Sequence, residues 1–128
     1  MADPISKRVL VVDDNADAAG MLALLLRRAG HTVDLAYSGA SAMAAARAHK
    51  PEAILLDIGM PRMDGLKVAR QFREQPETKD CLIVAVTGHG GEEDRERTKQ
   101  AGFDHHLVKP VKPEQILELL GRQSGDAA

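Results

Sequence analysis

Short apolar runs alternate five times along the chain with longer stretches of helical periodicity. The apolar runs lie at 9–12, 32–36, 53–56, 82–86 and 107–108. The first, third and fourth runs are apolar on both faces, as strands covered by helices are, whereas the second alternates and the fifth is short. The pattern predicts an α/β fold with a doubly wound parallel sheet, in which the second and fifth runs are edge strands.

Amphipathic helices are predicted between these runs. The clearest helix carries Ala18, Met21, Leu22 and Leu25 at positions i, i+3, i+4 and i+7, and Gly30 is placed to end it. Apolar spacing and the prolines that follow two of the segments predict three more helices, at 39–49, 64–75 and 113–121.

The stretch 92–100 differs from the other helical segments. It reads Glu-Glu-Asp-Arg-Glu-Arg-Thr-Lys-Gln and contains no apolar residue. A helix that is polar on all sides has little apolar surface with which to pack against a sheet. We therefore predict a helix that packs loosely through Thr98 and Ala101 and is the most mobile helix of the fold.

Length and composition indicate one globular domain. The 128 residues suffice for a single core, with a short disordered tail at about 124–128. A net charge of -2 argues against a nucleic-acid or membrane-surface partner, and an aromatic content of 2% excludes the base-stacking platforms of single-strand binders. The single cysteine, Cys81, cannot form an internal disulfide, so we expect a reduced protein. No apolar run is long enough to span a membrane and residues 1–6 do not resemble a signal peptide, so we expect a cytoplasmic location.

Five polar residues follow the ends of predicted strands. Asp13 and Asp14 come after the first strand, Asp57 after the third, Thr87 after the fourth and Lys109 after the fifth. Ligands of open parallel sheets bind at the carboxyl edge of the strands. With one reversal in the order of the crossovers, the first and third strands are neighbours, so the three aspartates share one pocket.

Three carboxylates in one pocket either share a proton at a raised pKa or bind a cation. Oxygen ligands without cysteine or a pair of histidines indicate a hard ion, and Mg²⁺ suits a site with few carboxylates and several waters. Taken alone, each residue also has an ordinary structural explanation: Asp14 as a helix N-cap, Asp57 in a turn, Thr87 as a strand-end hydroxyl and Lys109 as a solvated cation. Their common position at one edge favours a site.

Four motifs carry a family resemblance over essentially the whole chain. They are Val-Val-Asp-Asp at 11–14, Leu-Leu-Asp-Ile-Gly-Met-Pro-Arg-Met-Asp-Gly at 55–65, Val-Thr-Gly at 86–88 and Lys-Pro at 109–110. Together they resemble the receiver domain of bacterial two-component response regulators. The resemblance implies a flavodoxin-like (βα)5 fold, a five-stranded parallel sheet with strand order 2-1-3-4-5. The stretch 102–111 is similar to receivers of hybrid sensor kinases and to the single-domain regulators that serve them.

The resemblance also implies roles for individual residues. Asp57 would be the phosphoacceptor, whose carboxylate attacks phosphorus and forms an acyl phosphate. Mg²⁺ would be bound by Asp14 directly, by Asp13 mainly through water, by Asp57 and by the backbone carbonyl of Gly59. Lys109 would stabilise the charge that builds up on the phosphoryl oxygens.

The same resemblance makes Thr87 the switch residue, whose hydroxyl moves toward the phosphoryl group and displaces the loop that follows. The family usually carries Tyr or Phe three residues before the lysine, whereas this chain has His106. A histidine there would swing in a similar way, make switching sensitive to pH, or have no consequence at all.

Adjacent strand residues face apart, so we expect no metal site from His105 and His106. The Lys109-Pro110 bond resembles the family's cis peptide.

Three functions from different classes fit these residues. The leading one is a phosphorylation switch, which catalyses only its own phosphorylation and dephosphorylation. An aspartyl-phosphate hydrolase shares the nucleophile, the metal and the lysine, but such enzymes typically resemble Asp-x-Asp, and here Asp57 is followed by Ile58 and Gly59. A receiver-like binding module that has lost phosphorylation is the third, and the complete set of site residues argues against it.

The resemblance also implies partners. The phosphodonor would be a histidine kinase or a histidine phosphotransfer protein. The chain ends soon after the fifth predicted helix, so we expect the output to be a protein contact through the fourth helix, fifth strand and fifth helix, at 92–121. We expect a monomer or a weak homodimer.

Overall fold

Strands and helices alternate strictly along the computed structural model, which describes residues 6–59, 64–88 and 91–121. The tail expected at 124–128 lies outside these residues. The elements are β1 (Arg8–Val12), α1 (Ala16–Arg28), β2 (Thr32–Ala36), α2 (Gly39–His49), β3 (Ala53–Asp57), α3 (Gly65–Glu74), β4 (Leu82–Thr87), α4 (Glu92–Ala101), β5 (His105–Val108) and α5 (Pro113–Gly121).

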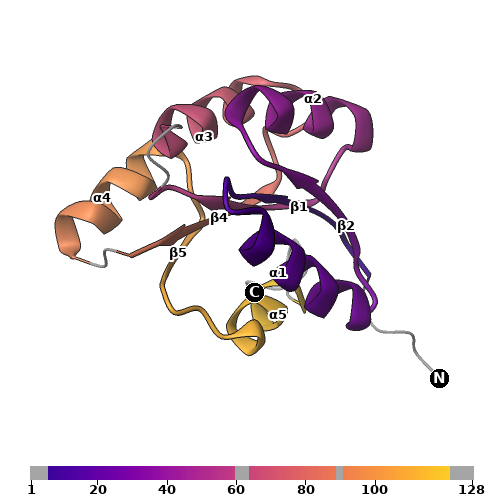
Figure 1. Cartoon of the computed structure of the whole chain (residues 1–128). Coiled ribbons are helices and arrows are strands. Elements are labelled where there is room, and N and C mark those ends of the chain that lie inside the picture. The colour runs from indigo at the N-terminus through magenta and orange to yellow at the C-terminus, as the bar shows by residue number, and fades with distance from the viewer. Residues whose placement is uncertain (1–5, 60–63, 89–90, 122–128) are drawn as a thin grey trace.

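The strands form one parallel sheet in the order β2-β1-β3-β4-β5 (Figure 1). This order confirms the predicted doubly wound, flavodoxin-like topology, with β2 and β5 at the edges. The chain passes from β1 to β2 on one side and then crosses back to β3 on the other side of β1. The carboxyl ends of β1 and β3 are therefore neighbours at the point where the winding reverses.

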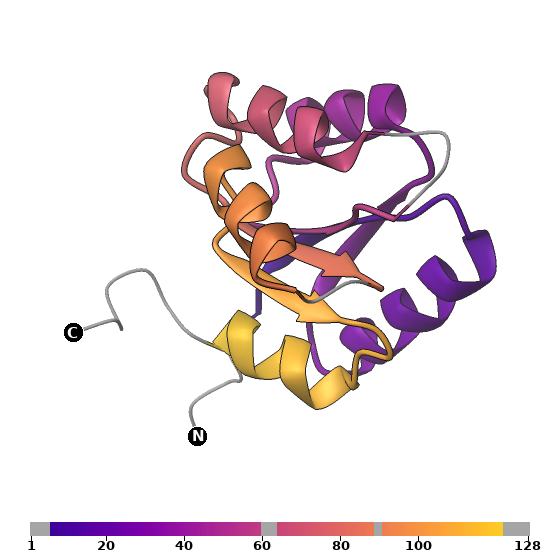
Figure 2. The same ribbon diagram turned by 90° about the vertical axis from the view of Figure 1, so that its left-hand side faces the viewer.

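Helices cover both faces of the sheet, with α2, α3 and α4 on one face and α1 and α5 on the other (Figures 1 and 2). Each face has its own buried cluster, one around Phe72 and Ile83 and the other around Leu26 and Ile116. Burial of these apolar side chains is the main force that holds the layers together. Among the helices that the structure describes, none combines the length and the apolar surface that a membrane span requires.

The ends of the elements follow from local hydrogen bonding. β3 and β4 each extend one residue beyond the apolar run that predicted them, so that Asp57 and Thr87 are their last residues. The helix predicted at 64–75 begins one residue later, because Asp64 is its N-cap and accepts hydrogen bonds from the backbone N–H groups of Leu66 and Lys67.

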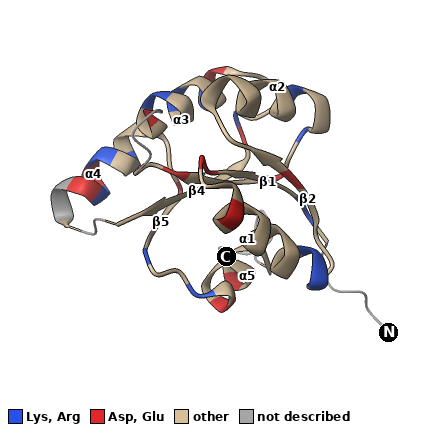
Figure 3. Cartoon of the chain, viewed as in Figure 1, with Lys and Arg blue, Asp and Glu red and all other residues tan. Residues whose placement is uncertain are grey.

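The polar segment at 92–100 is helical, as predicted, and its helix α4 continues to Ala101. Thr98 and Ala101 are buried, which confirms the two expected contacts with the rest of the fold. Charged residues line the described part of α4 (Figure 3), and Arg95, Glu96 and Arg97 are exposed. The mobility of this helix stays a prediction.

Cys81 lies in the core. Its thiol donates a hydrogen bond to the carbonyl oxygen of Pro51 at 2.8 Å. Burial raises the pKa of the thiol to about 11. A thiol with so high a pKa is almost entirely protonated at neutral pH, so Cys81 serves as a packing residue.

Gly65, the first residue of α3, gives a test of how tightly the segment after β3 is packed. A Cβ atom at Gly65 would lie 2.9 Å from the backbone Cα of Ile58, a distance that requires the backbone to shift. We therefore expect Gly65→Ala to lower the free energy of unfolding by about 1–3 kcal/mol. Urea denaturation followed by circular dichroism measures this change.

Gly20, inside α1, is the matched control, because a Cβ there meets no atom within 4 Å. Gly20→Ala should raise the free energy of unfolding by about 0.5–1 kcal/mol, since alanine is the better helix former. Equal effects of the two substitutions would show that the close approach of Gly65 to Ile58 has no energetic weight.

Candidate functional site

Asp57 is the centre of the site at the carboxyl edge of the sheet. It is only 6% exposed. Its Oδ2 accepts a hydrogen bond from the Lys109 ammonium at 2.7 Å, and its Oδ1 accepts one from the backbone N–H of Gly59 at 2.8 Å. Each carboxylate oxygen therefore has a donor of its own, which offsets the cost of burying a charge.

Lys109 reaches Asp57 because the ends of β4 and β5 are joined. The backbone N–H of Lys109 donates to the carbonyl oxygen of Thr87 at 2.7 Å, directly after the last pair of the β4–β5 ladder. Thr87 itself is buried at the end of β4. The peptide Lys109-Pro110 is cis, which confirms that prediction.

Asp13 lies at the end of β1, the neighbour of β3. Its Oδ1 accepts a hydrogen bond from the backbone N–H of Asn15 at 2.9 Å. Burial raises the pKa of the Asp13 carboxyl above its usual value; the negative charges of Asp57 and Asp14 raise it further, while the Asn15 N–H and Lys109 oppose the shift. The electrostatic coupling of the three aspartates supports the sequence-based expectation that they lie close together.

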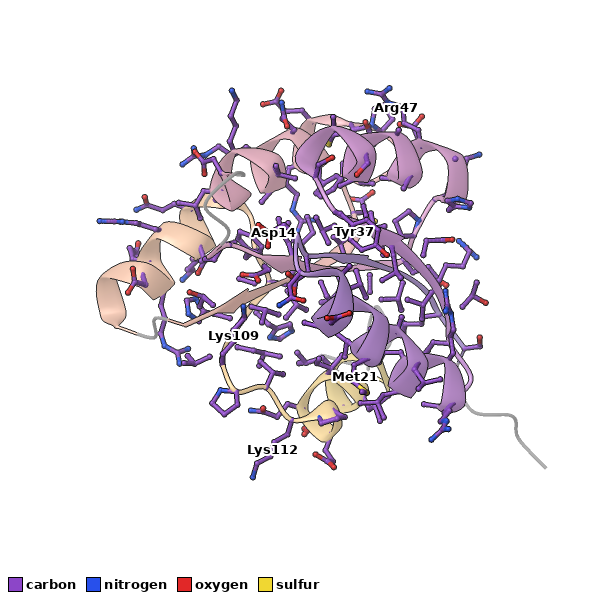
Figure 4. All side chains as sticks on the ribbon, viewed as in Figure 1. Asp14, Met21, Tyr37, Arg47, Lys109 and Lys112 are labelled. Carbon is purple, nitrogen blue, oxygen red and sulfur yellow. The ribbon has the colours of Figure 1, made fainter. Side chains whose placement is uncertain are left out.

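Asp14 is an exposed residue between β1 and α1. Figure 4 labels it together with Lys109, and both lie in the central part of that view. The N-cap of α1 is Asn15, whose side chain accepts a hydrogen bond from the backbone N–H of Ala18 at 3.1 Å. The alternative explanation of Asp14 as an ordinary helix cap is therefore wrong.

The donor set at this edge suits a hard cation. Carboxylate groups gather here, and the pKa of Asp13 is raised first by burial and then by the negative charges of Asp57 and Asp14, which a cation would offset. Within residues 6–59, 64–88 and 91–121, no three Asp, Glu, His or Cys side chains are grouped so that they could hold a metal ion. Mg²⁺ keeps several waters and needs only one or two protein carboxylates, so the residues present fit this ion.

The histidine pair of β5 lies on opposite faces of the sheet, as expected. His105 pairs in register with Val84 and His106 with Ala85, and these partners belong to the two different buried clusters. The Nδ1 atom of His106 is hydrogen-bonded to the Thr98 hydroxyl of α4 at 3.0 Å. His106 therefore connects β5 to α4, a contact that no pattern in the sequence predicts.

The fold and the site together define a flavodoxin-like α/β protein with an acidic pocket and a lysine at the switch point of its sheet. The sequence matches the response regulator receiver domain family over residues 9–121. It is 30% identical over 123 residues to the polar-differentiation response regulator DivK of Brucella ovis. This alignment covers 96% of this chain and 100% of DivK. The chain belongs to the receiver domain family of two-component response regulators.

Solved structures agree with this assignment. The chemotaxis protein CheY4 of Vibrio cholerae superposes with a TM-score of 0.85 at 32% identity, over 91% of this chain and 97% of that chain. The receiver domain of sensor histidine kinase PA1611 from Pseudomonas aeruginosa PAO1 has a TM-score of 0.80 at 31% identity, over 91% of this chain and 95% of that chain. The PA1611 domain has a magnesium ion coordinated in its active-site cleft.

The pKa of Asp13 tests the electrostatic arrangement of the pocket. Asp57 raises this pKa and Lys109 lowers it. We therefore expect Asp57→Asn to lower the pKa of Asp13 and Lys109→Met to raise it, relative to the unsubstituted protein. Carbon-13 NMR titration of the side-chain carboxyl groups, without added divalent cation, measures both shifts. Shifts of the same sign in the two variants would contradict this geometry.

Proposed function

We propose that this protein is a phosphoacceptor switch in a two-component or phosphorelay pathway. Asp57 accepts a phosphoryl group from the phosphohistidine of a histidine kinase or histidine phosphotransfer protein, with Mg²⁺ as cofactor. The observation that carries the proposal is the buried Asp57 carboxylate, hydrogen-bonded to Lys109 at 2.7 Å beside the electrostatically coupled Asp13. A cytoplasmic location belongs to the same proposal.

The transfer forms one bond and breaks another. A carboxylate oxygen of Asp57 bonds to phosphorus while the bond between phosphorus and the donor's imidazole nitrogen breaks, so the leaving group is the partner's histidine. The Lys109 ammonium then donates to the phosphoryl oxygens, and so does the Thr87 hydroxyl. Without these donors, the acidic pocket would repel an anionic phosphoryl donor.

The direct metal ligands of this proposal are Asp14, Asp57 and the carbonyl oxygen of Gly59, and Asp13 binds the ion mainly through water. Mg²⁺, when bound, supplies positive charge that offsets the charge of the transferring phosphoryl group. The Asn15 N–H orients Asp13 in advance, because it holds one carboxylate oxygen at 2.9 Å. The Gly59 N–H does the same for Asp57.

The output of the switch is a protein contact through α4, β5 and α5, and the chain acts as a monomer or a weak homodimer. A groove of about 500 Å³ lies on this face. We call it the α4–β5 groove; Arg95, Lys99, His105, His106 and Leu119 are among its lining residues. Phosphorylation acts on this face through Thr87, which ends the strand next to β5.

The residue two positions after the nucleophile favours a switch over an aspartyl-phosphate hydrolase. That position is Gly59, which has no side chain to protonate a leaving group. The Gly59 N–H is instead used to hold Asp57. We therefore assign no substrate turnover beyond the protein's own phosphorylation and dephosphorylation.

Intact mass spectrometry after incubation with acetyl phosphate and Mg²⁺ tests the proposal. We expect a gain of one phosphoryl group, about 80 Da by formula, that Asp57→Asn or a chelator abolishes. Lys109→Met should slow the gain at least tenfold, because the buried carboxylate loses its cation.

Asp64→Asn is the matched control for this measurement. Asp64 is an exposed aspartate that caps α3, and asparagine is an equally good cap, so the variant should gain the phosphoryl group at the normal rate. A gain that persists in Asp57→Asn would refute the assigned nucleophile. If neither acetyl phosphate nor a phosphohistidine donor modifies the protein, it is a binding module without phosphorylation.

A further inference from the structure

Arg73, near the end of α3, forms a network at the edge of the sheet opposite the acidic pocket. Its Nε and Nη2 atoms donate to the carbonyl oxygen of Gly102 at 2.8 and 2.6 Å. Its Nη1 donates to the carbonyl oxygens of Lys79 and Cys81 at 3.0 and 2.7 Å, and Nη2 also donates to Asp104 Oδ2 at 2.8 Å. Every N–H group of the guanidinium therefore has an acceptor.

The main target of Arg73 is the C-terminal end of α4. Gly102 is the C-cap of this helix and has φ 105°, a left-handed conformation that favours glycine. A Cβ atom at Gly102 would lie 2.8 Å from Cγ of Arg73, so the close approach of the arginine also requires glycine there.

Asp104 links this cap to the sheet. Its Oδ2 accepts the hydrogen bond from Arg73 and another from the backbone N–H of Ile83 at 2.8 Å. Its own backbone N–H donates to the carbonyl oxygen of Ile83 at 2.7 Å. The end of α4 is thereby tied to α3, to the start of β4 and to the start of β5.

The described side chains in the N-terminal half of α4, at 94–97, are all exposed or half-buried. Gly91 is its N-cap and offers no side-chain hydrogen bond to the first turn. The first buried side chain among the described residues of α4 is Thr98, which is 2% exposed. Thr98 bonds to His106 and lies at the boundary between the two halves. Regions with few buried contacts open at a lower free-energy cost than the rest of a fold.

We propose that Arg73 is a positioning residue that fixes the C-terminal end of α4, so that conformational change in this helix is confined to residues 91–97. Residues 91–97 then move relative to a fixed C-terminal part of the helix that ends at Gly102. In the α4–β5 groove, Arg95 then lies on the mobile half, whereas Lys99 lies on the fixed half. The link between this motion and phosphorylation rests on the proposed function, but the anchoring by Arg73 does not.

Hydrogen exchange of the full chain, read by mass spectrometry or NMR, tests the anchor without phosphorylation. The amides of 95–97 and of 99–103 are compared, because both groups are hydrogen-bonded within α4 or its cap. We expect 95–97 to exchange at least tenfold faster than 99–103. In Arg73→Gln, exchange at 99–103 should rise at least tenfold and approach that of 95–97.

Arg70→Gln is the control, since Arg70 is an exposed residue of the same helix. It should leave both segments unchanged. If Arg73→Gln does not fold, Arg73→Lys serves instead, because lysine keeps the charge but cannot form the planar set of hydrogen bonds. Equal exchange of the two segments in the unsubstituted protein would overturn the proposal, and so would a uniform rise over the whole chain in the variant.

The same experiment with acetyl phosphate and Mg²⁺ tests the link to the switch. Within α4, phosphorylation should alter exchange only at 91–97, and in Arg73→Gln the change should extend to 99–103. A change that already covers 99–103 in the unsubstituted protein would refute the proposal that the change is confined to 91–97. If intact mass shows no phosphorylation, the proposed function fails, and the comparison without phosphorylation still decides whether Arg73 anchors the helix.

Discussion

The buried charge of Asp57 is the constraint on which the rest of the site depends. A carboxylate that is 6% exposed is unfavourable unless donors and positive charge surround it. The Gly59 N–H and the Lys109 ammonium meet this need in the resting state. The same two donors hold the carboxylate at the carboxyl edge of the sheet. In the proposed function, this arrangement also orients the carboxylate for attack on the phosphoryl group.

The sheet topology explains why these groups meet. The chain reverses its winding between β2 and β3, so β1 and β3 are neighbours and their terminal aspartates share the carboxyl edge. β4 and β5 extend the sheet on the other side of β3 and bring Thr87 and Lys109 to the same edge. The opposite edge carries the Arg73 network, which fixes the elements there. The acidic pocket and the Arg73 network therefore lie at opposite ends of the strands.

Much of this could be predicted from the sequence, because the core strands are unbroken apolar runs and each site residue directly follows one of them. The parallel sheet, the helices and the position of Asp13, Asp57 and Lys109 at one edge follow from that pattern, whereas the full strand order is implied by the family resemblance. The details that escaped prediction depend on contacts between distant segments. The five hydrogen bonds of Arg73 and the bond of His106 to Thr98 leave no periodic signal. Asp14 and Asn15 are both favourable N-cap residues, so the sequence alone does not show that Asn15 caps α1.

The most direct test of the account is to locate the modified residue itself. After treatment with acetyl phosphate and Mg²⁺, borohydride reduction converts an aspartyl acyl phosphate to homoserine, and tandem mass spectrometry of peptides then identifies the position. We expect homoserine at Asp57, with Asp13, Asp14 and Asp64 unchanged. Homoserine at another aspartate, or a phosphoryl group retained on a histidine, would contradict the claim that the buried carboxylate at the end of β3 is the phosphoacceptor.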